Sequence, residues 1–183
     1  MSAARRPARL AEAGSALDDY LGALLDDGAA ATTAAAAAAF PVRLFEVAGL
    51  KLALPAAELE AVLAEARTRP CAAAPGGVVA GEMAWRQGRC QVIDLARLVL
   101  PPGRAATLDA DIDARAPWRL VFDGGRRAIA CDAVGDVVEL EPGGVTWRGP
   151  GGRRPWLAGT VAAWRCALLD SKGLIAAIGA GMA

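Results

Sequence analysis

The stretch Gly81-Glu-Met-Ala-Trp-Arg-Gln-Gly-Arg-Cys-Gln-Val-Ile-Asp-Leu95 decides the fold, because the chain contains its pattern twice. Apolar and polar residues alternate on both sides of a Gly-containing turn, and this predicts a strand, a tight turn and a second strand. An Ala-Gly pair leads through Trp85 to Cys90, and Asp94 follows the cysteine by four residues.

The second copy of this pattern occupies residues 159–170. Its Ala-Gly pair leads through Trp164 to Cys166, and Asp170 again follows the cysteine by four residues. An Asp that closes an apolar run can accept backbone N–H bonds at the start of the next turn or helix. We therefore interpret the aspartate of each copy as a capping residue, and the recurrence predicts two copies of one folding unit.

Two β-hairpins predicted at residues 42–54 and 118–131 support the duplication, since each has a central glycine turn. Arg43 and Arg119 are 76 residues apart, which equals the separation of the two aspartates just described (119 − 43 and 170 − 94). Strand-rich halves with Gly and Pro turns at short spacing favour a mainly β fold of two small barrels or sandwiches.

The domain organisation follows from changes in composition along the chain. Residues 1–39 are made largely of Ala, Gly, Ser, Arg and Asp, and we expect a flexible extension there. The β domain is expected at residues 40–178, with a first half at about 40–100 and a second at about 118–178. Between the halves, residues 101–117 are polar and bounded by prolines, and they are long enough to be a mobile linker.

Two segments of the β domain have less definite patterns. Local propensity predicts a helix over residues 56–66, with Leu59, Val62 and Leu63 on one side. The apolar residues 173–178 fit either a strand or a short closing helix.

The N-terminal extension contains one amphipathic segment, a predicted helix at about residues 15–27 that starts with a Ser-x-x-Asp motif. Leu17, Tyr20, Leu21 and Leu24 form an apolar stripe at helical spacing. A helix this short is marginal in free solution, and acidic residues near its C-terminus oppose the helix dipole. The segment should therefore dock into a groove of another protein, or alternatively pack back on its own domain.

The composition argues against several classes of function. The net charge is zero and histidine is absent, which removes the commonest general base and metal ligand. The cysteines occur singly, without the CxxC spacing of zinc or redox sites, and we expect them to be buried as small hydrophobic residues. We therefore expect no enzyme, no cofactor and no metal. We also expect no nucleic-acid partner, because a neutral chain lacks a broad basic surface.

Membrane insertion is also not expected. No apolar run reaches the roughly 18 residues that a membrane span needs, and the N-terminus lacks the apolar core of a signal peptide. The sequence therefore predicts a cytoplasmic protein.

A Gly- and Arg-rich loop at residues 148–155 is the leading interface candidate. Trp147 and Trp156 flank it and it contains Arg148 and Arg154, and Trp and Arg are enriched at interface hot spots. The alternative, a phosphate-binding loop of an enzyme or nucleotide-binding protein, lacks the Gly-x-x-x-x-Gly-Lys-Ser/Thr order and a following helix.

The first copy resembles a known family. Gly81, then Arg86, then Val92-Ile93-Asp94-Leu95 is similar to the Gly-x-x-x-x-Arg-Gly and Val-x-Asp-Leu signature of CheW-like domains, which couple chemoreceptors to the histidine kinase CheA. The resemblance covers about residues 41–178 and implies a tandem of two five-stranded SH3-like barrels, with a strand in place of the predicted helix at 56–66. Gln87 stands where the family has glycine, which favours a divergent branch.

A finer resemblance is to the ParP proteins of polar chemotaxis arrays. It is carried by Val145-Thr-Trp-Arg148, by Arg154-Pro-Trp-Leu-Ala-Gly159 and by the segment from Leu17 to Leu21. These proteins have an N-terminal extension before a CheW-like array-integrity domain. The resemblance implies a non-catalytic adaptor located at the cell pole.

The resemblance also implies which residues make the contacts. CheA would bind through Trp147, Arg148, Arg154 and Trp156, and a chemoreceptor tip would contact Arg86. A ParC-like ATPase of the ParA family would bind through Leu17, Tyr20, Leu21 and Leu24, with Tyr20 as the central anchor. The alternative within the family is an ordinary CheW coupling protein that links receptors to CheA.

Overall fold

The hairpin predicted at residues 81–95 is formed by β4 and β5, which pair antiparallel with Trp85 opposite Gly88. The computed structural model describes residues 38–71, 77–149 and 152–180. The strands are β1 (Phe40–Val47), β2 (Leu50–Pro55), β3 (Leu59–Ala64), β4 (Val79–Trp85), β5 (Gly88–Ile93), β6 (Trp118–Phe122), β7 (Arg127–Cys131), β8 (Ala133–Leu140), β9 (Thr146–Trp147), β10 (Leu157–Val161) and β11 (Cys166–Leu169). The helices are α2 (Leu95–Val99), α3 (Pro102–Ala105), α4 (Ile112–Arg115) and α5 (Ser171–Gly179), with 3₁₀ turns η1 (Ala56–Glu58), η2 (Pro142–Gly144) and η3 (Ala162–Trp164).

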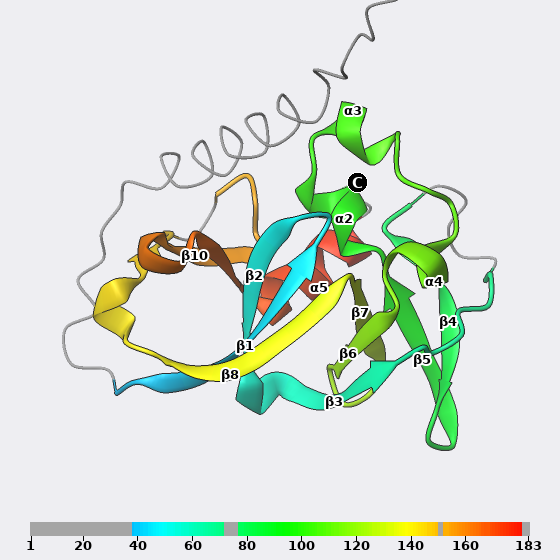
Figure 1. The fold of residues 1–183 in the computed structure, drawn as a ribbon, viewed down its shortest axis with the longest axis horizontal. Coiled ribbons are helices and arrows are strands. Elements are labelled where there is room, and N and C mark those ends of the chain that lie inside the picture. Colours follow the sequence, from blue (N-terminus) through cyan, green and yellow to red (C-terminus); the bar gives the residue numbers. More distant parts are fainter. Residues whose placement is uncertain (1–37, 72–76, 150–151, 181–183) are drawn as a thin grey trace, which may run out of the picture.

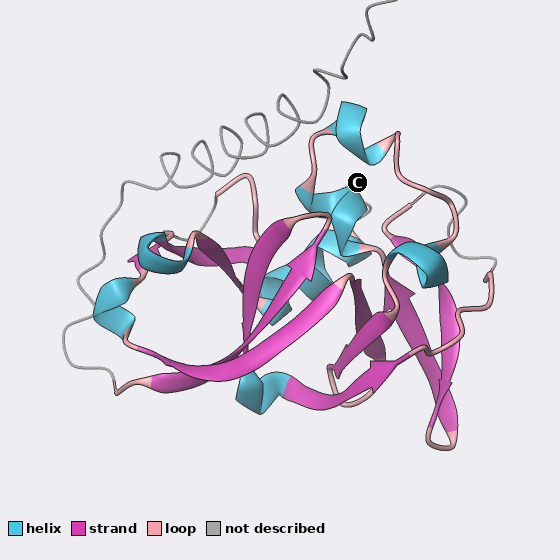
Figure 2. Ribbon diagram, viewed as in Figure 1, coloured by secondary structure: helices cyan, strands magenta, loops and turns pink. Residues whose placement is uncertain are grey.

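These strands form two sheets that lie next to each other (Figures 1 and 2). The six-stranded sheet has the order β8-β1-β2-β11-β10-β9, and the five-stranded sheet has the order β3-β6-β7-β5-β4. The predicted mainly β fold with two small sheets is confirmed, although one sheet has six strands where five were expected.

The two halves of the sequence do not coincide with the two sheets. The β1–β2 hairpin of the first half pairs with β8 and with β11, both from the second half. The β6–β7 hairpin of the second half joins β3 and β5 of the first half. Each sheet therefore contains strands from residues 40–100 and from residues 118–178, so the halves hold each other together.

The duplication is visible in matching backbone details. The two-residue turn of the first hairpin has Ala48 at φ 50° and Gly49 at φ 80°, as a type I′ turn requires. The turn of the second hairpin is two residues longer, and Asp123, Gly124 and Gly125 in it have φ of 56°, 64° and 82°. Both turns thus have successive residues with positive φ. Both predicted hairpins and their turns are therefore confirmed.

The glycine of each Ala-Gly pair lies where another backbone comes close. A Cβ on Gly81 would be 2.2 Å from the carbonyl oxygen of Arg69, and one on Gly159 would be 2.8 Å from that of Thr146. The strand register shifts just before each of these glycines. The repeated glycine therefore allows a neighbouring segment to pack against the irregular start of each hairpin.

We expect Gly81→Ala and Gly159→Ala each to lower the free energy of unfolding by about 1–3 kcal/mol, because the added methyl group forces backbone apart. Urea unfolding followed by circular dichroism measures the change. Gly143→Ala is the matched control, since a Cβ there meets nothing within 4 Å. Equal stability of the three variants would show that the close approaches can relax without cost.

The segment 56–66 is a strand after its first turn. The helix predicted from local propensity is wrong, and the strand implied by the family resemblance is present as β3. Leu59 lies opposite Phe122 and Val62 opposite Leu120 in the antiparallel pairing of β3 with β6. Pairing with a strand distant in sequence overrides the local preference.

The segment 101–117, expected as a mobile linker, contains the short helices α3 and α4. Asp111 caps α4 by accepting from the backbone N–H groups of Asp113 and Ala114. Ile112 and Ala116 are buried against the five-stranded sheet's cluster of apolar side chains. This part of the connection is therefore attached to the domain, which differs from the expectation.

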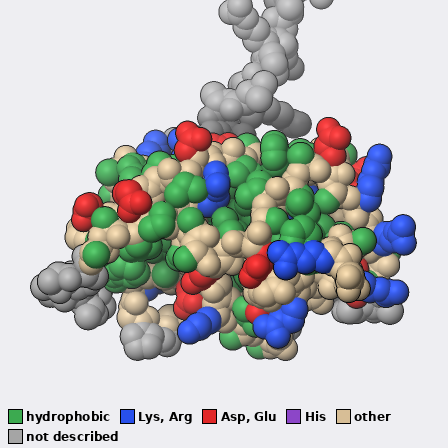
Figure 3. Space-filling view, turned by 90° about the horizontal axis from the view of Figure 1, so that it is seen from below, with side chains coloured by type: hydrophobic (Ala, Val, Ile, Leu, Met, Phe, Trp, Pro, Cys, Tyr) green, Lys and Arg blue, Asp and Glu red, His purple; other side chains and the backbone are tan. Residues whose placement is uncertain are grey.

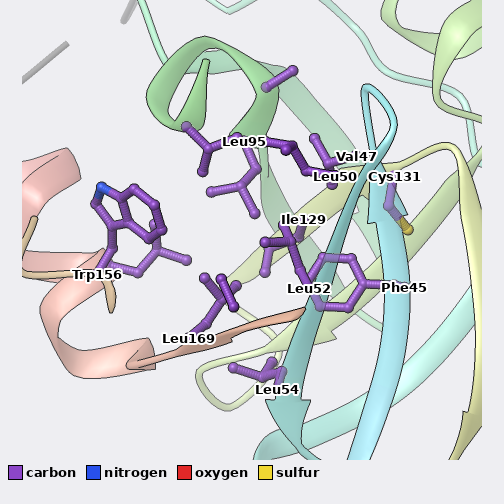
Figure 4. Packing of buried hydrophobic residues seen from close by; sticks show 14 of the residues in the cluster. Phe45, Val47, Leu50, Leu52, Leu54, Leu95, Ile129, Cys131, Trp156 and Leu169 are labelled. Carbon is purple, nitrogen blue, oxygen red and sulfur yellow. The ribbon is translucent and has the colours of Figure 1, made fainter. Parts of the chain in front are cut away.

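The main core lies between the two sheets and the helices α2 and α5 (Figure 4). Phe45 and Leu52 from the six-stranded sheet meet Ile129 from the five-stranded sheet. The chain's C-terminal apolar run forms the helix α5, which buries Leu174. The sheets thus share one core, as their exchanged hairpins require.

The predicted helix at residues 15–27, with Leu17, Tyr20, Leu21 and Leu24, lies outside the described residues. Among the residues that the structure describes, no helix has the length and apolar character needed to cross a membrane.

Candidate interaction surfaces

Trp147 lies at an edge of the six-stranded sheet. It ends the short strand β9, which pairs only with β10 within that sheet. Its indole is half-buried: Nε1 donates to the carbonyl oxygen of Pro142 at 3.0 Å, and its ring centroid is 6.4 Å from that of Phe40. The ring is held in one place and keeps an exposed side, as an interface anchor requires.

Trp156 is a core residue, which corrects its assignment to the kinase-binding surface. Its side chain is only 3% exposed and belongs to the main core with Leu95 and Leu169 (Figure 4). Its carbonyl oxygen accepts from the backbone N–H of Asp170 at 2.8 Å. A buried indole offers no surface to a partner in this conformation.

Arg148 and Arg154 are both half-buried at the ends of the Gly- and Arg-rich loop. The backbone N–H of Arg148 donates to the carbonyl oxygen of Ala158 at 2.9 Å, which extends the β9–β10 pairing by one residue. Arg148 thus adjoins Trp147 at the sheet edge, whereas Trp156 lies in the interior.

Arg86 is exposed at the tip of the β4–β5 hairpin. Its φ of 50° belongs to the left-handed region of the turn, and its guanidinium lies 5.1 Å from the ring centroid of Trp85. This cation–π contact orients the side chain while leaving its donors exposed. Trp85 is in turn covered by the β6–β7 turn, where a Cβ on Gly125 would be 2.5 Å from Nε1 of the indole.

A basic pocket of about 640 Å³ lies beside this hairpin. Arg67, Arg69 and Arg89 line it, and one carboxylate, Glu82, lies 3.3 Å from Arg89. Figure 3 shows several Lys and Arg side chains at the right-hand end of the molecule, where β4 and β5 lie. Sequence reasoning missed Arg67 and Arg69, because only the tertiary structure brings their segment against β4.

Asp94 does not cap α2, so its predicted role is wrong. Its buried carboxylate forms an ion pair with Arg97 at 2.9 Å and another with Arg115. Asp170, by contrast, accepts from the backbone N–H groups of Lys172 and Gly173 at the start of α5, as predicted. In the first copy, the aspartate therefore does not cap a helix but holds α4 of the connecting segment through its ion pair with Arg115.

Arg119 is a fully buried cation. Its Nη2 forms an ion pair with Asp113 and also donates to Thr68 Oγ1 at 2.9 Å, while Nη1 donates to the carbonyl oxygen of Trp118 at 2.9 Å. Burial raises the pKa of Asp113, but hydrogen bonds from Thr68 and the charge of Arg119 outweigh it, so the net pKa is lowered. The cluster fixes α4 and the segment before β4 to β6.

Three cysteines are buried, and burial makes their thiols unreactive. Burial raises the pKa of the Cys90 thiol to about 11 and those of Cys131 and Cys166 to about 12. At neutral pH these thiols are protonated and poor nucleophiles. Within the described residues, no cluster of His, Cys, Asp or Glu is arranged to bind a metal ion.

No protein-family model and no curated protein matches the chain. Among solved structures, it is similar to the scaffolding protein CheW of Thermoanaerobacter tengcongensis, with a TM-score of 0.58 and 14% sequence identity. The match covers 73% of this chain and 90% of that one. The chain therefore has a CheW-like fold.

Proposed function

We propose that this protein is a non-catalytic chemotaxis adaptor that binds the histidine kinase CheA through its CheW-like domain. The observation that carries the proposal is the two-sheet architecture with exchanged hairpins, which is similar to that of a scaffolding protein. Two further contacts belong to the proposal: chemoreceptor tips at Arg86, and a ParC-like ATPase of the ParA family at residues 15–27. The last contact would place the protein at the cell pole.

The kinase surface in this proposal is the β9 edge, with Trp147 as its anchor and Arg148 and Arg154 around it. An edge strand has unpaired backbone groups that a partner strand can extend. A half-buried Trp beside arginines is the composition of an interface hot spot. The regulatory domain of CheA, itself CheW-like by the family resemblance, would dock here.

The receptor surface in this proposal is the basic end of the five-stranded sheet. Arg86 projects from the hairpin tip, and Arg67, Arg69 and Arg89 surround the adjoining pocket. Such a surface attracts a partner segment that carries carboxylates. Two separate surfaces on one domain would allow the adaptor to hold receptor and kinase together.

The test distinguishes the binding role of the β domain from that of the N-terminal extension. Trp147→Ala should weaken binding of the full chain to the CheA regulatory domain at least about tenfold, as expected for a hot-spot aromatic residue. Tyr20→Ala should leave that affinity unchanged and abolish polar positioning of the fluorescently tagged protein in cells. Calorimetry and microscopy are the measurements, with Val137→Ala as a control for the loss of an exposed apolar side chain.

Three results would count against this two-site function. One is loss of CheA binding in both variants, the second is loss in neither, and the third is unfolding of Trp147→Ala. An ordinary CheW coupling protein is the second candidate, favoured by the similarity to CheW over the described β domain. It predicts that Tyr20→Ala changes neither CheA binding nor cellular position.

A further inference from the structure

A groove of about 730 Å³ opens at the end of the six-stranded sheet that carries the β1–β2 turn. Its walls come from β1, β8 and the η3–β11 junction, and they are mostly apolar. Leu44, Phe45, Val134 and Trp164 lie on the walls, and the charged residues that line the groove are Glu46, Lys51 and Arg165. Lys51 is exposed, while Leu44, Val134 and Trp164 are half-buried.

The duplication explains how the groove arises on the six-stranded sheet. Trp164-Arg165 repeats Trp85-Arg86, and the two arginines share a left-handed φ of 49° and 50°. In the first copy the neighbouring hairpin turn lies directly on the Trp85 indole. In the second copy Trp164 and the equivalent turn glycine, Gly49, both line the groove. One copy of the unit is closed over its tryptophan and the other is open.

We propose that this groove binds residues 15–27 of the same chain. The stripe of Leu17, Tyr20, Leu21 and Leu24 has the apolar character of the groove walls, and a short amphipathic helix is stabilised when such a stripe is buried. Asp18, at the border of this stripe on the predicted helix, is complementary in charge to Lys51 and Arg165, two of the three charged residues that line the groove.

The length of the connection suits this docking. Residues 28–39 would span about 20 Å as a flexible chain, and β1 covers roughly the same distance from Phe40 to Glu46 at about 3.3 Å per residue. When the length of a linker matches the span, the effective concentration is of millimolar order. If the dissociation constant for docking is about 0.1 mM, the ratio of docked to free segment is therefore about ten.

Self-docking has a consequence for any partner of the same stripe. That partner must displace the segment from the groove, so its apparent affinity falls in proportion to the free fraction. The contact is therefore autoinhibitory. It does not depend on the identity of the polar partner, and it can be tested with the isolated full chain.

Hydrogen–deuterium exchange on the full chain tests the proposal. Tyr20→Asp should raise exchange about tenfold at residues 46–51 and 162–166, in line with the docked fraction above. Residues 81–93 of the other sheet should not change. Gly22→Asp is the matched control, because it adds the same charge on the opposite face of the predicted helix, and it should exchange like the wild type.

A charge swap adds a second readout. Lys51→Glu should raise exchange at the same residues, and the further change of Asp18 to Lys should restore protection. Equal exchange in the wild type and in Tyr20→Asp would overturn the proposal. Protection that disappears on dilution would also overturn it, because the occupant would then be a second copy of the chain. Neither outcome would affect CheA binding at the β9 edge.

Discussion

Replacing Trp156 by alanine is expected to lower the free energy of unfolding by about 3–5 kcal/mol, the range for deleting a buried aromatic side chain. The indole is 3% exposed and packs in the core shared by both sheets. Its removal leaves a cavity that the helix α5 and the two sheets can fill only in part. Urea unfolding monitored by circular dichroism measures the loss.

Trp147→Ala is the control for this prediction. Its ring is half-buried and donates one hydrogen bond, to Pro142, so its loss should cost only about 1–2 kcal/mol. Trp156→Ala should therefore lower the free energy of unfolding more than Trp147→Ala does, whereas Trp147→Ala should weaken CheA binding more. If Trp156→Ala kept wild-type stability and lost CheA affinity, Trp156 would be a contact residue of the kinase interface.

Arg119→Met is expected to cost about 3 kcal/mol at neutral pH, because it leaves the Asp113 carboxylate without its cation. The methionine side chain preserves most of the volume, so the loss reports chiefly on charge and hydrogen bonding. Asp113 keeps some contact with water and a hydrogen bond from the backbone N–H of Thr68, which limits the penalty. Unfolding of Arg119→Met, Asp113→Asn and the double variant separates the pairwise contribution from the rest.

The pH dependence of the free energy of unfolding shows whether the Arg119–Asp113 ion pair stabilises the fold. The pKa of Asp113 is lowered in the folded protein, so its stabilising contribution is complete above the unfolded-state pKa of about 3.9 and is lost as the pH falls through the folded pKa. The stability gap between the wild type and Arg119→Met should therefore narrow on acidification. A gap that stays constant from neutral to strongly acidic pH would exclude the ion pair as its cause.

The candidate surfaces could be predicted from sequence only in part. Arg86 is exposed at a hairpin tip, which the order of residues predicts. Trp147 was predicted only to flank a loop, and the tertiary structure places it, half-buried, on an edge strand. Trp156 has a similar neighbourhood in sequence, yet its ring points into the core. Arg67 and Arg69 form a pocket only because their segment crosses β4. The positions of such side chains depend on contacts that the local pattern does not contain.

The sequence by itself determined the hairpins, their turns and the duplication, because alternation, glycine turns and a constant 76-residue offset are local and repeated signals. It also determined the cap at Asp170. Only the tertiary structure decided that the hairpins exchange between halves, that residues 59–64 form a strand, and that Asp94 binds Arg115 where its counterpart caps a helix. The physical reason is that strand pairing and buried charge are satisfied by partners distant in the chain, which local propensity cannot specify.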